Sequence, residues 1–139
     1  MESWVLFALL SAIMAALATI FAKVGLQKVD SITATALRSV IMMLLALSIM
    51  IFARGFEAAK SLTQSEIIFI ILSGIAGGLS WIFYFLALQK GEASLVSAID
   101  RASLLFVLLF AIIFLHEELT LKKILSIALI TIALYLIIL

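Results

Sequence analysis

The stretch IIFIILSGIAGGLSWIFYFLALQ, residues 67–89, contains no charged side chain and decides the fold class of this chain. A helix needs about 20 predominantly apolar residues to cross the hydrocarbon core of a bilayer, and this stretch is long enough to do so. Its apolar residues form one continuous run, whereas a membrane β-barrel shows segments of about ten residues with alternating polarity. The stretch therefore predicts a transmembrane α-helix.

Uncharged runs of the same kind fill nearly the whole chain. Hydrophobic residues make up 67% of the 139 residues and charged residues only 12%, a balance that no soluble domain of this length could bury. The sequence thus predicts an all-α, polytopic membrane protein with five transmembrane helices and its two termini on opposite sides of the membrane. We expect a single membrane domain over residues 1–139, with helices at about 4–22, 32–53, 66–88, 94–115 and 121–139.

Capping residues mark several of the predicted helix ends. Asp30 and Ser31 are candidate caps of the second helix, Thr63 forms a capping-box pattern with Glu66, and Thr120 is a candidate cap of the last helix. Proline is absent from the chain. We therefore expect no helix to be broken in the proline-kinked manner of many carriers, and any flexibility to come from glycine.

The composition excludes several classes of function. Without cysteine there are no disulfides, thiolate metal sites or redox chemistry, and a lone histidine cannot build a metal site, so we expect no metal and no cofactor. The short connections and the net charge of +1 offer no basic patch for nucleic acid. No nucleophile and base stand out as a catalytic pair, so an enzyme is not expected. The helices themselves must carry the function.

Asp100 and Arg101, in the stretch SAIDRASLLF at residues 97–106, are predicted to lie inside the membrane. If the fourth helix began after Arg101, residues 102–115 would span only about 21 Å, which is too short. A start near Ser94 restores a full span and places Asp100 about 9 Å below the helix start. Arg38 lies at about the same depth and on the same side of the membrane. Arg101 can extend back to the surface, but the shorter aspartate cannot.

A buried Asp100 needs a partner other than Arg101, because adjacent residues on a helix point about 100° apart. Arg38 and Lys23 are the cations whose helices could bring them to this level, and an unpaired buried carboxylate is costly. We predict an ion pair between Arg38 and Asp100 with Lys23 close by, in a charged layer that also contains Arg101. Two roles remain open, namely a static lock between helices and a gate or binding site for an anionic or zwitterionic group.

The third predicted helix carries small and polar residues on one face. Ser73, Gly77, Ser80 and Tyr84 are spaced by four, three and four residues and so share a face. One interpretation is helix packing, for which the neighbouring GxxxG pair of Gly74 and Gly78 is suited. The other is a translocation path that offers a substrate hydroxyl groups and aromatic faces. The candidate path consists of Ser73, Gly77, Ser80, Trp81 and Tyr84.

The flanking charges do not select an orientation in the membrane. The side of the N-terminus carries Arg54, Lys60, Lys122 and Lys123, and the other side carries Lys23, Lys28 and Lys90, with Arg38 and Arg101 if those are counted. Two copies in opposite orientations would reproduce the inverted repeats of many transporters. An antiparallel homodimer is therefore one hypothesis, and a fixed orientation set by other details is the alternative.

The chain resembles the EamA-type domain of the drug/metabolite transporter superfamily, in particular its five-helix, single-domain bacterial and archaeal members. The resemblance is carried by AKVGLQKVDSITATALRS (22–39), by LSWIFYFLALQKGEASLVSAIDRASLLFVLLFAIIFLHEELT (79–120) and by the apolar closing helix. Asp100, Arg101 and Ser103 match the aspartate, basic residue and serine that are common early in the family's fourth helix. The chain departs from the family in having Ala98 where a proline is frequent, and His116 where a glycine commonly precedes the glutamate.

The resemblance implies transport of small metabolites or drugs by alternating access between two five-helix halves, of which this chain holds one. It further implies a homodimer in the inner or plasma membrane of a prokaryote, with the last helix at its centre and with Ser126 and Ile130 as candidate contacts. The expected partners are the lipid bilayer, a second copy of the chain and a small-molecule substrate. An alternative from another class is a membrane scaffold or accessory subunit that transports nothing.

Overall fold

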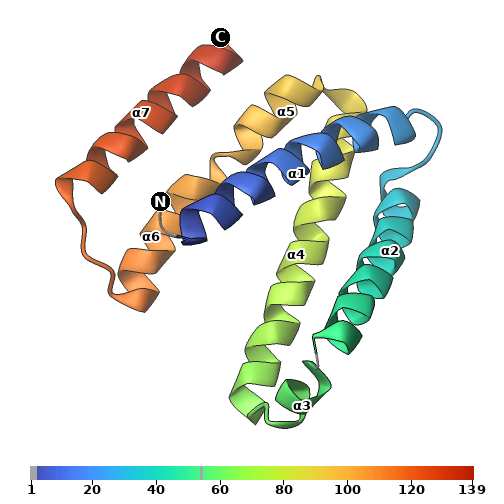
Figure 1. The fold of residues 1–139 in the computed structure, drawn as a ribbon. Helices are drawn as coiled ribbons and strands as arrows, with labels where there is room; N and C mark the ends of the chain where they lie inside the picture. Colours follow the sequence, from blue (N-terminus) through green and yellow to red (C-terminus); the bar gives the residue numbers. More distant parts are fainter. Residues whose placement is uncertain (1–2, 54) are drawn as a thin grey trace. The chain divides into compact units, whose positions relative to one another are not determined.

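The computed structural model describes residues 3–53 and 55–139. All regular secondary structure in these residues is helical, and five segments are long and apolar enough to cross a membrane, which confirms the predicted fold class. The helices are α1 (Ser3–Gly25), α2 (Ser31–Phe52), α3 (Gly55–Lys60), α4 (Gln64–Lys90), α5 (Ala93–Asp100), α6 (Ser103–Leu115) and α7 (Leu121–Ile138) (Figure 1).

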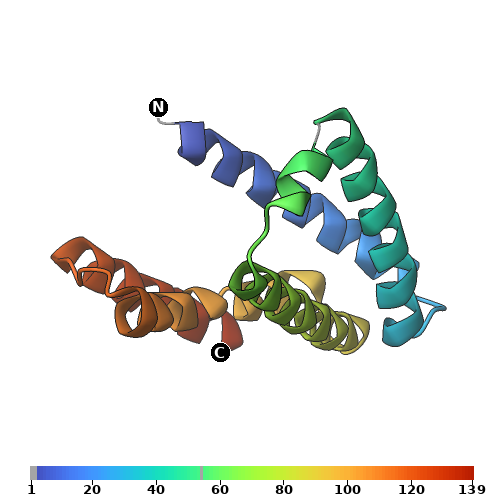
Figure 2. The ribbon, with the colours of Figure 1, turned by 90° about the horizontal axis from the view of Figure 1, so that it is seen from below.

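The chain divides into two compact units, Met1–Lys90 and Gly91–Leu139. In the first unit α4 contacts both α1 and α2, and the short α3 lies at the turn between α2 and α4 (Figures 1 and 2). In the second unit α7 returns towards α5 and contacts it. Helix α3 is not among the helices predicted from the sequence, because six residues are too short for a periodic pattern to indicate a helix.

The predicted caps Asp30, Thr63 and Thr120 are confirmed, whereas Ser31 is the first residue of α2 and not its cap. Asp30 begins α2 by accepting a hydrogen bond from the amide of Thr33 at 2.9 Å. Hydrogen bonds from the hydroxyl and the amide of Thr33 also hold the pKa of Asp30 below its ordinary value of 3.8. Thr63 and Glu66 form the reciprocal capping box, in which each amide donates to the other side chain. Thr120 caps α7 through its side-chain oxygen.

The predicted fourth span is confirmed over Ala93–Leu115, but its helix is interrupted between α5 and α6, which the sequence did not predict. Helix α5 ends at Asp100 and α6 begins at Ser103. At the break the amide of Arg101 donates to the carbonyl of Ala98 at 3.0 Å, which is a tight 3₁₀-type bond. Aspartate and serine are weak helix formers, so neither proline nor glycine is needed to interrupt the helix here.

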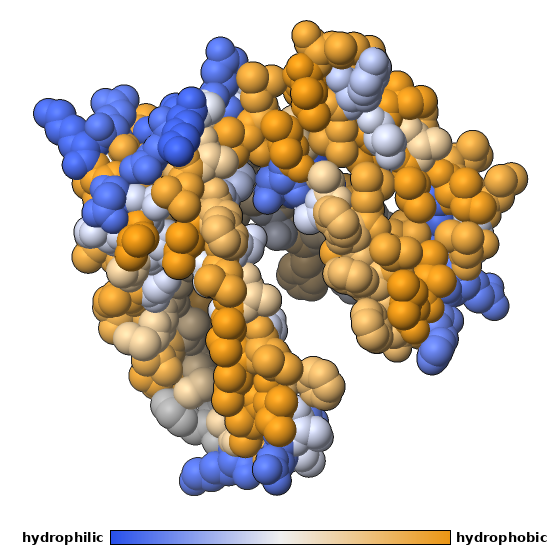
Figure 3. All heavy atoms as spheres, turned by 180° about the vertical axis from the view of Figure 1, so that it is seen from behind, coloured by the Kyte–Doolittle hydropathy of each residue, from blue (hydrophilic) through white to orange (hydrophobic). Residues whose placement is uncertain are grey.

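Apolar side chains cover most of the surface of the described residues (Figure 3). Phe114 is 73% exposed and Phe7 is 67% exposed. In lipid, helices gain nothing by hiding apolar faces from their surroundings, so this surface is what a bilayer-embedded bundle presents. The buried apolar residues among those described are Leu26, Phe85, Leu88 and Ala111.

Six hydroxyl groups within the spans are satisfied by their own helices. Each donates a hydrogen bond of 2.7 to 3.0 Å to the carbonyl four residues earlier. This local bond gives the hydroxyl group a hydrogen-bond partner where water is absent. The residues concerned are Thr19, Thr35, Ser39, Ser48, Ser126 and Thr131.

Helix α6 ends in a left-handed residue. His116 adopts φ 52° and ψ 34°, and the amide of Glu117 reaches back to the carbonyl of Ala111 at 3.2 Å. Glycine adopts this backbone conformation without steric cost, whereas other L-residues pay about 1–2 kcal/mol. His116, at the position where the family resemblance predicts glycine, thus adopts a backbone conformation that suits glycine.

We expect His116→Gly to raise the free energy of unfolding by about 0.5–1 kcal/mol and His116→Val to lower it by at least about 1 kcal/mol, because a branched side chain suits the left-handed region least. His116→Asn, which also tolerates this conformation, is the matched control and should be near neutral. Reversible unfolding in mixed micelles measures all three. A less stable glycine variant would contradict the assignment.

Candidate functional site

The ends of α1 and α4 are tied together at one corner of the first unit. Lys23 Nζ in α1 donates to the carbonyl oxygen of Leu88 in α4 at 2.6 Å. Gln89 Nε2 donates to the carbonyl of Val29, in the connection that leads to α2, at 2.8 Å. Because the last carbonyls of a helix lack partners within the helix, Lys23 satisfies one of them. The corner therefore fixes where side chains from α1, α2 and α4 converge.

A hydroxyl pair links the same two helices one turn deeper. Thr19 Oγ1 and Tyr84 Oη lie 2.8 Å apart, and Thr19 is 8% exposed. Thr19 donates its single hydroxyl hydrogen to the carbonyl of Ala15 at 3.0 Å. It therefore accepts from Tyr84, which is the donor of the pair.

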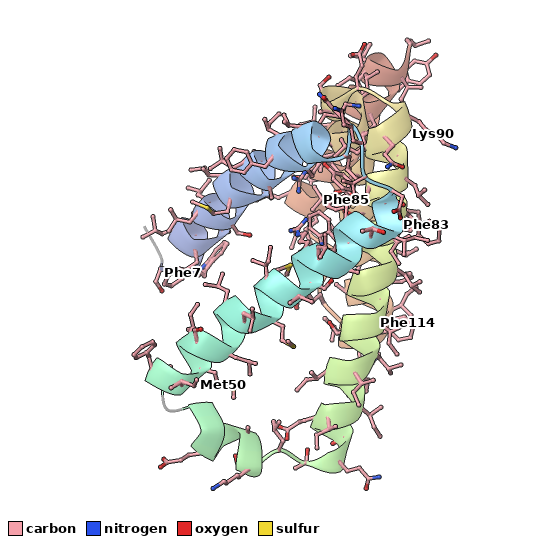
Figure 4. The ribbon with its side chains drawn as sticks, turned by 90° about the vertical axis from the view of Figure 1, so that its right-hand side faces the viewer. Phe7, Met50, Phe83, Phe85, Lys90 and Phe114 are labelled. Carbon is pink, nitrogen blue, oxygen red and sulfur yellow. The ribbon has the colours of Figure 1, made fainter. Side chains whose placement is uncertain are left out.

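Arg38 of α2 stacks on the aromatic side chains of α4. Its Cζ lies 3.4 Å from the ring centroid of Trp81 and 5.7 Å from that of Phe85. Trp81 and Phe85 pack edge to face with centroids 5.5 Å apart. Phe85 is 3% exposed and points towards α1 and α2, whereas Phe83 points away from them (Figure 4). A guanidinium on an indole face makes a favourable cation–π contact.

Two grooves meet at Arg38. The α1–α2 groove has a volume of about 540 Å³ and is lined by residues that include Ala22, Leu26, Ala34, Ile41, Phe85 and Arg38. The α2–α4 groove has a volume of about 450 Å³ and is lined by residues that include Thr35, Arg38, Ser39, Gly74, Gly77 and Trp81. Both volumes lie in the range of small-molecule sites.

The guanidinium of Arg38 has a buried nitrogen, Nη1, without a hydrogen-bond partner among the described residues. The walls around it are almost entirely apolar. Among the described residues, Arg38 therefore has a buried N–H donor that no other group satisfies.

The residues of the predicted path separate into three groups. Gly77 and Trp81 line the α2–α4 groove. Tyr84 faces α1 and bonds to Thr19, while Ser73 and Ser80 are exposed and line neither groove. The separation arises because four residues on one helical face spread along its length, and only part of that length meets α2.

Gly74 and Gly78 also line the α2–α4 groove. A Cβ atom added to either residue, or to Gly77, would meet nothing within 4 Å outside the helix. The glycine face of α4 is therefore open towards the groove in the described chain, and its role in helix packing stays a prediction.

The remaining predicted site residues lie in the second unit. Asp100 is the last residue of α5, and Arg101 lines a hollow of about 300 Å³ together with Ile130. Ser126 and Ile130 line another hollow of about 260 Å³. Because Arg38 belongs to the first unit and Asp100 to the second, the ion pair between them stays a prediction, as does the contact of Ser126 and Ile130 with a second chain.

The contact of Arg38 with the rings of Trp81 and Phe85 was not predicted from the sequence. Phe85 follows Trp81 by four residues and so shares its helical face. Thr35 lies three residues before Arg38 and Ser39 lies one residue after it. Both line the α2–α4 groove together with Arg38. The spacing indicates which residues share a face of one helix. The contact with Arg38 depends on how α2 crosses α4, which the spacing does not determine.

Comparison with known proteins gives the family. The model of the EamA-like transporter family matches residues 2–139. The chain belongs to this family. A relative from Sinorhizobium sp., named "Uncharacterized transporter in cobO 3'region", is 37% identical over 127 residues, which cover 91% of this chain and 90% of the relative. No solved structure matches the chain.

Membership of this family makes the chain a multi-pass membrane transporter of the drug/metabolite type. The exposed apolar helices agree with a lipid environment. The family also points to transport rather than catalysis, as the sequence predicts. The two grooves at Arg38 are therefore candidates for the place where a solute is held.

The hydrogen bond between Thr19 and Tyr84 should contribute measurably to the first unit. We expect Thr19→Val and Tyr84→Phe each to lower the free energy of unfolding, with a coupling energy of about 0.5–1 kcal/mol in a double-mutant cycle, as for other intramembrane hydrogen bonds. Thr19→Ser keeps the acceptor oxygen and is the matched control. Strictly additive effects of the two substitutions would show that the hydroxyls do not interact.

Proposed function

We propose that the protein moves small organic solutes across the cell membrane of a prokaryote by alternating access, working as a homodimer of two five-helix halves. The observation that carries the proposal is the pair of grooves on either side of α2, which share Arg38 as their polar group. A solute held at Arg38 would be reached through one groove or the other as α2 shifts against α1 and α4.

One feature supports a second copy as the other half. The flanking cations are balanced between the two sides of the membrane, which permits both orientations. An antiparallel pair would create an inverted repeat from two identical chains.

The alternative is a membrane scaffold or accessory subunit that transports nothing. In that case Arg38, Trp81 and Phe85 would hold α2 against α4, and the grooves would be filled by lipid chains or by another subunit. The two functions differ in whether the purified protein alone moves a solute.

Transport should be measured with purified protein in liposomes loaded with a mixture of small metabolites, whose efflux is followed by mass spectrometry. We expect protein-dependent efflux of a subset of them. Gly77→Phe should reduce it by about tenfold or more, because an added Cβ meets nothing within 4 Å and the ring beyond it would occupy space in the α2–α4 groove. Leu79→Phe, at an exposed position two residues away, is the matched control. Absence of efflux with the native protein, or full activity of Gly77→Phe, would favour the scaffold.

Orientation should be measured with single cysteines, since the chain has none of its own. Lys28→Cys and Lys60→Cys lie at opposite ends of α2. For an antiparallel homodimer, a membrane-impermeant maleimide should label about half of the molecules at each position, since each position faces outwards in one of the two copies. Complete labelling at one position and none at the other would mean a single orientation and exclude the antiparallel arrangement.

A further inference from the structure

We propose that Arg38 binds the carboxylate of an otherwise apolar organic anion, whose body lies in the grooves beside α2. This inference deepens the proposed function, because it names the chemical class of the solute held at that site. It rests on the geometry of Arg38 and on the chemistry of the surrounding walls.

The stacking of Arg38 does not use the hydrogen-bond donors at the edge of its guanidinium. Trp81 lies against the flat face of the guanidinium, with 3.4 Å between Cζ and the ring centroid. A face-on contact uses the π surface and leaves the N–H donors in the plane of the group. Nη1 is buried and has no hydrogen-bond partner among the described residues. The ring of Trp81 therefore holds the guanidinium in place and leaves the Nη1 donor without a hydrogen-bond partner.

The charges of the first unit do not provide a counter-ion beside Arg38, so a bound anion competes only with the predicted ion pair to Asp100 of the second unit. Its described acidic residues are Asp30, Glu57 and Glu66, which lie at helix ends or in the short α3. Asp30 already accepts the amide of Thr33 as the cap of α2, and Glu66 is occupied by the capping box with Thr63. Arg38 lies about 10 Å along α2 from its first residue. A positive charge at this depth is costly, and an anionic ligand would offset the cost.

The shape and chemistry of the grooves define the rest of the ligand. The α1–α2 groove is lined mainly by Ala, Leu, Ile, Val, Met and Phe side chains, with Arg38 as the charged group in the lining. The hydroxyls of Thr35 and Ser39 beside Arg38 donate to their own helix. One cation in apolar walls suits one carboxylate on an aliphatic or aromatic body. A planar carboxylate also accepts two parallel N–H bonds from a guanidinium, which a point charge cannot donate.

Binding can be tested without transport through the fluorescence of Trp81. Trp4→Phe leaves Trp81 as the only tryptophan, since the sequence has two. In phosphatidylcholine nanodiscs, this protein should be titrated with 4-phenylbutyrate, with its methyl ester and with 4-phenylbutylamine. We expect saturable binding of the carboxylate, with an affinity about tenfold or more above those of the ester and the amine. Equal binding of the three compounds would overturn the proposal.

Variants assign the effect to Arg38. Arg38→Met should lose about tenfold or more in carboxylate affinity, and Arg38→Lys should fall between it and the native residue, because lysine keeps the charge but not the planar fork. Lys28→Met, which removes one positive charge from an exposed loop, is the matched control and should bind normally. Unchanged affinity of Arg38→Met would overturn the proposal. If Arg38→Met fails to fold, the comparison of the three compounds on the native and Arg38→Lys proteins decides.

A lipid phosphate is the competing anion. Nanodiscs that contain phosphatidylglycerol should weaken carboxylate binding at most slightly. If phosphatidylglycerol alone gives an Arg38-dependent change and 4-phenylbutyrate adds nothing, the site holds a lipid headgroup and the proposal is wrong. Carboxylate binding without efflux from liposomes would leave this inference intact and refute the proposed transport. Efflux of uncharged solutes alone would support the proposed transport and refute this inference.

Discussion

The absence of water from the hydrocarbon core is the constraint on which this structure depends. Every polar group in a spanning helix must find a partner within the protein. The hydroxyls of Thr19, Thr35 and Ser39 do so by donating to carbonyls of their own helices. Lys23 does so by donating to the end of α4. Among the described residues, Arg38 contacts aromatic rings and keeps a buried donor without a partner, and it lies where two grooves meet.

The same constraint explains how few apolar residues are buried. Leu88 and Phe85 are hidden because they stand where α1, α2 and α4 converge, around polar contacts that need shielding. Elsewhere the lipid serves as the apolar partner, and large side chains such as Phe114 stay exposed. The specificity of the bundle therefore lies in polar contacts and close fits at one corner, rather than in a large hydrophobic core.

The sequence predicts the fold class well, because span length and charge spacing are one-dimensional properties. Caps such as Asp30 and Thr63 are likewise local and are readable from a few residues. The break after Asp100 escaped prediction, because it follows from weak helix formers and 3₁₀-type bonding rather than from proline. The contact of Arg38 with Trp81 was also not predicted, because it depends on the crossing of α2 and α4. The sequence did indicate Arg38 as a member of the charged layer and Trp81 as a member of the candidate path.

The most direct test of the account concerns the side chain of Arg38 itself. In nitrogen-15-labelled protein in nanodiscs, each arginine gives an Nε–Hε signal, and Arg38, Arg54 and Arg101 are the arginines of the chain. During titration with a carboxylate of an apolar body, the account predicts a saturable shift of the Arg38 signal while the other two stay in place. An unmoved Arg38 signal, or equal shifts of all three arginines, would contradict the account.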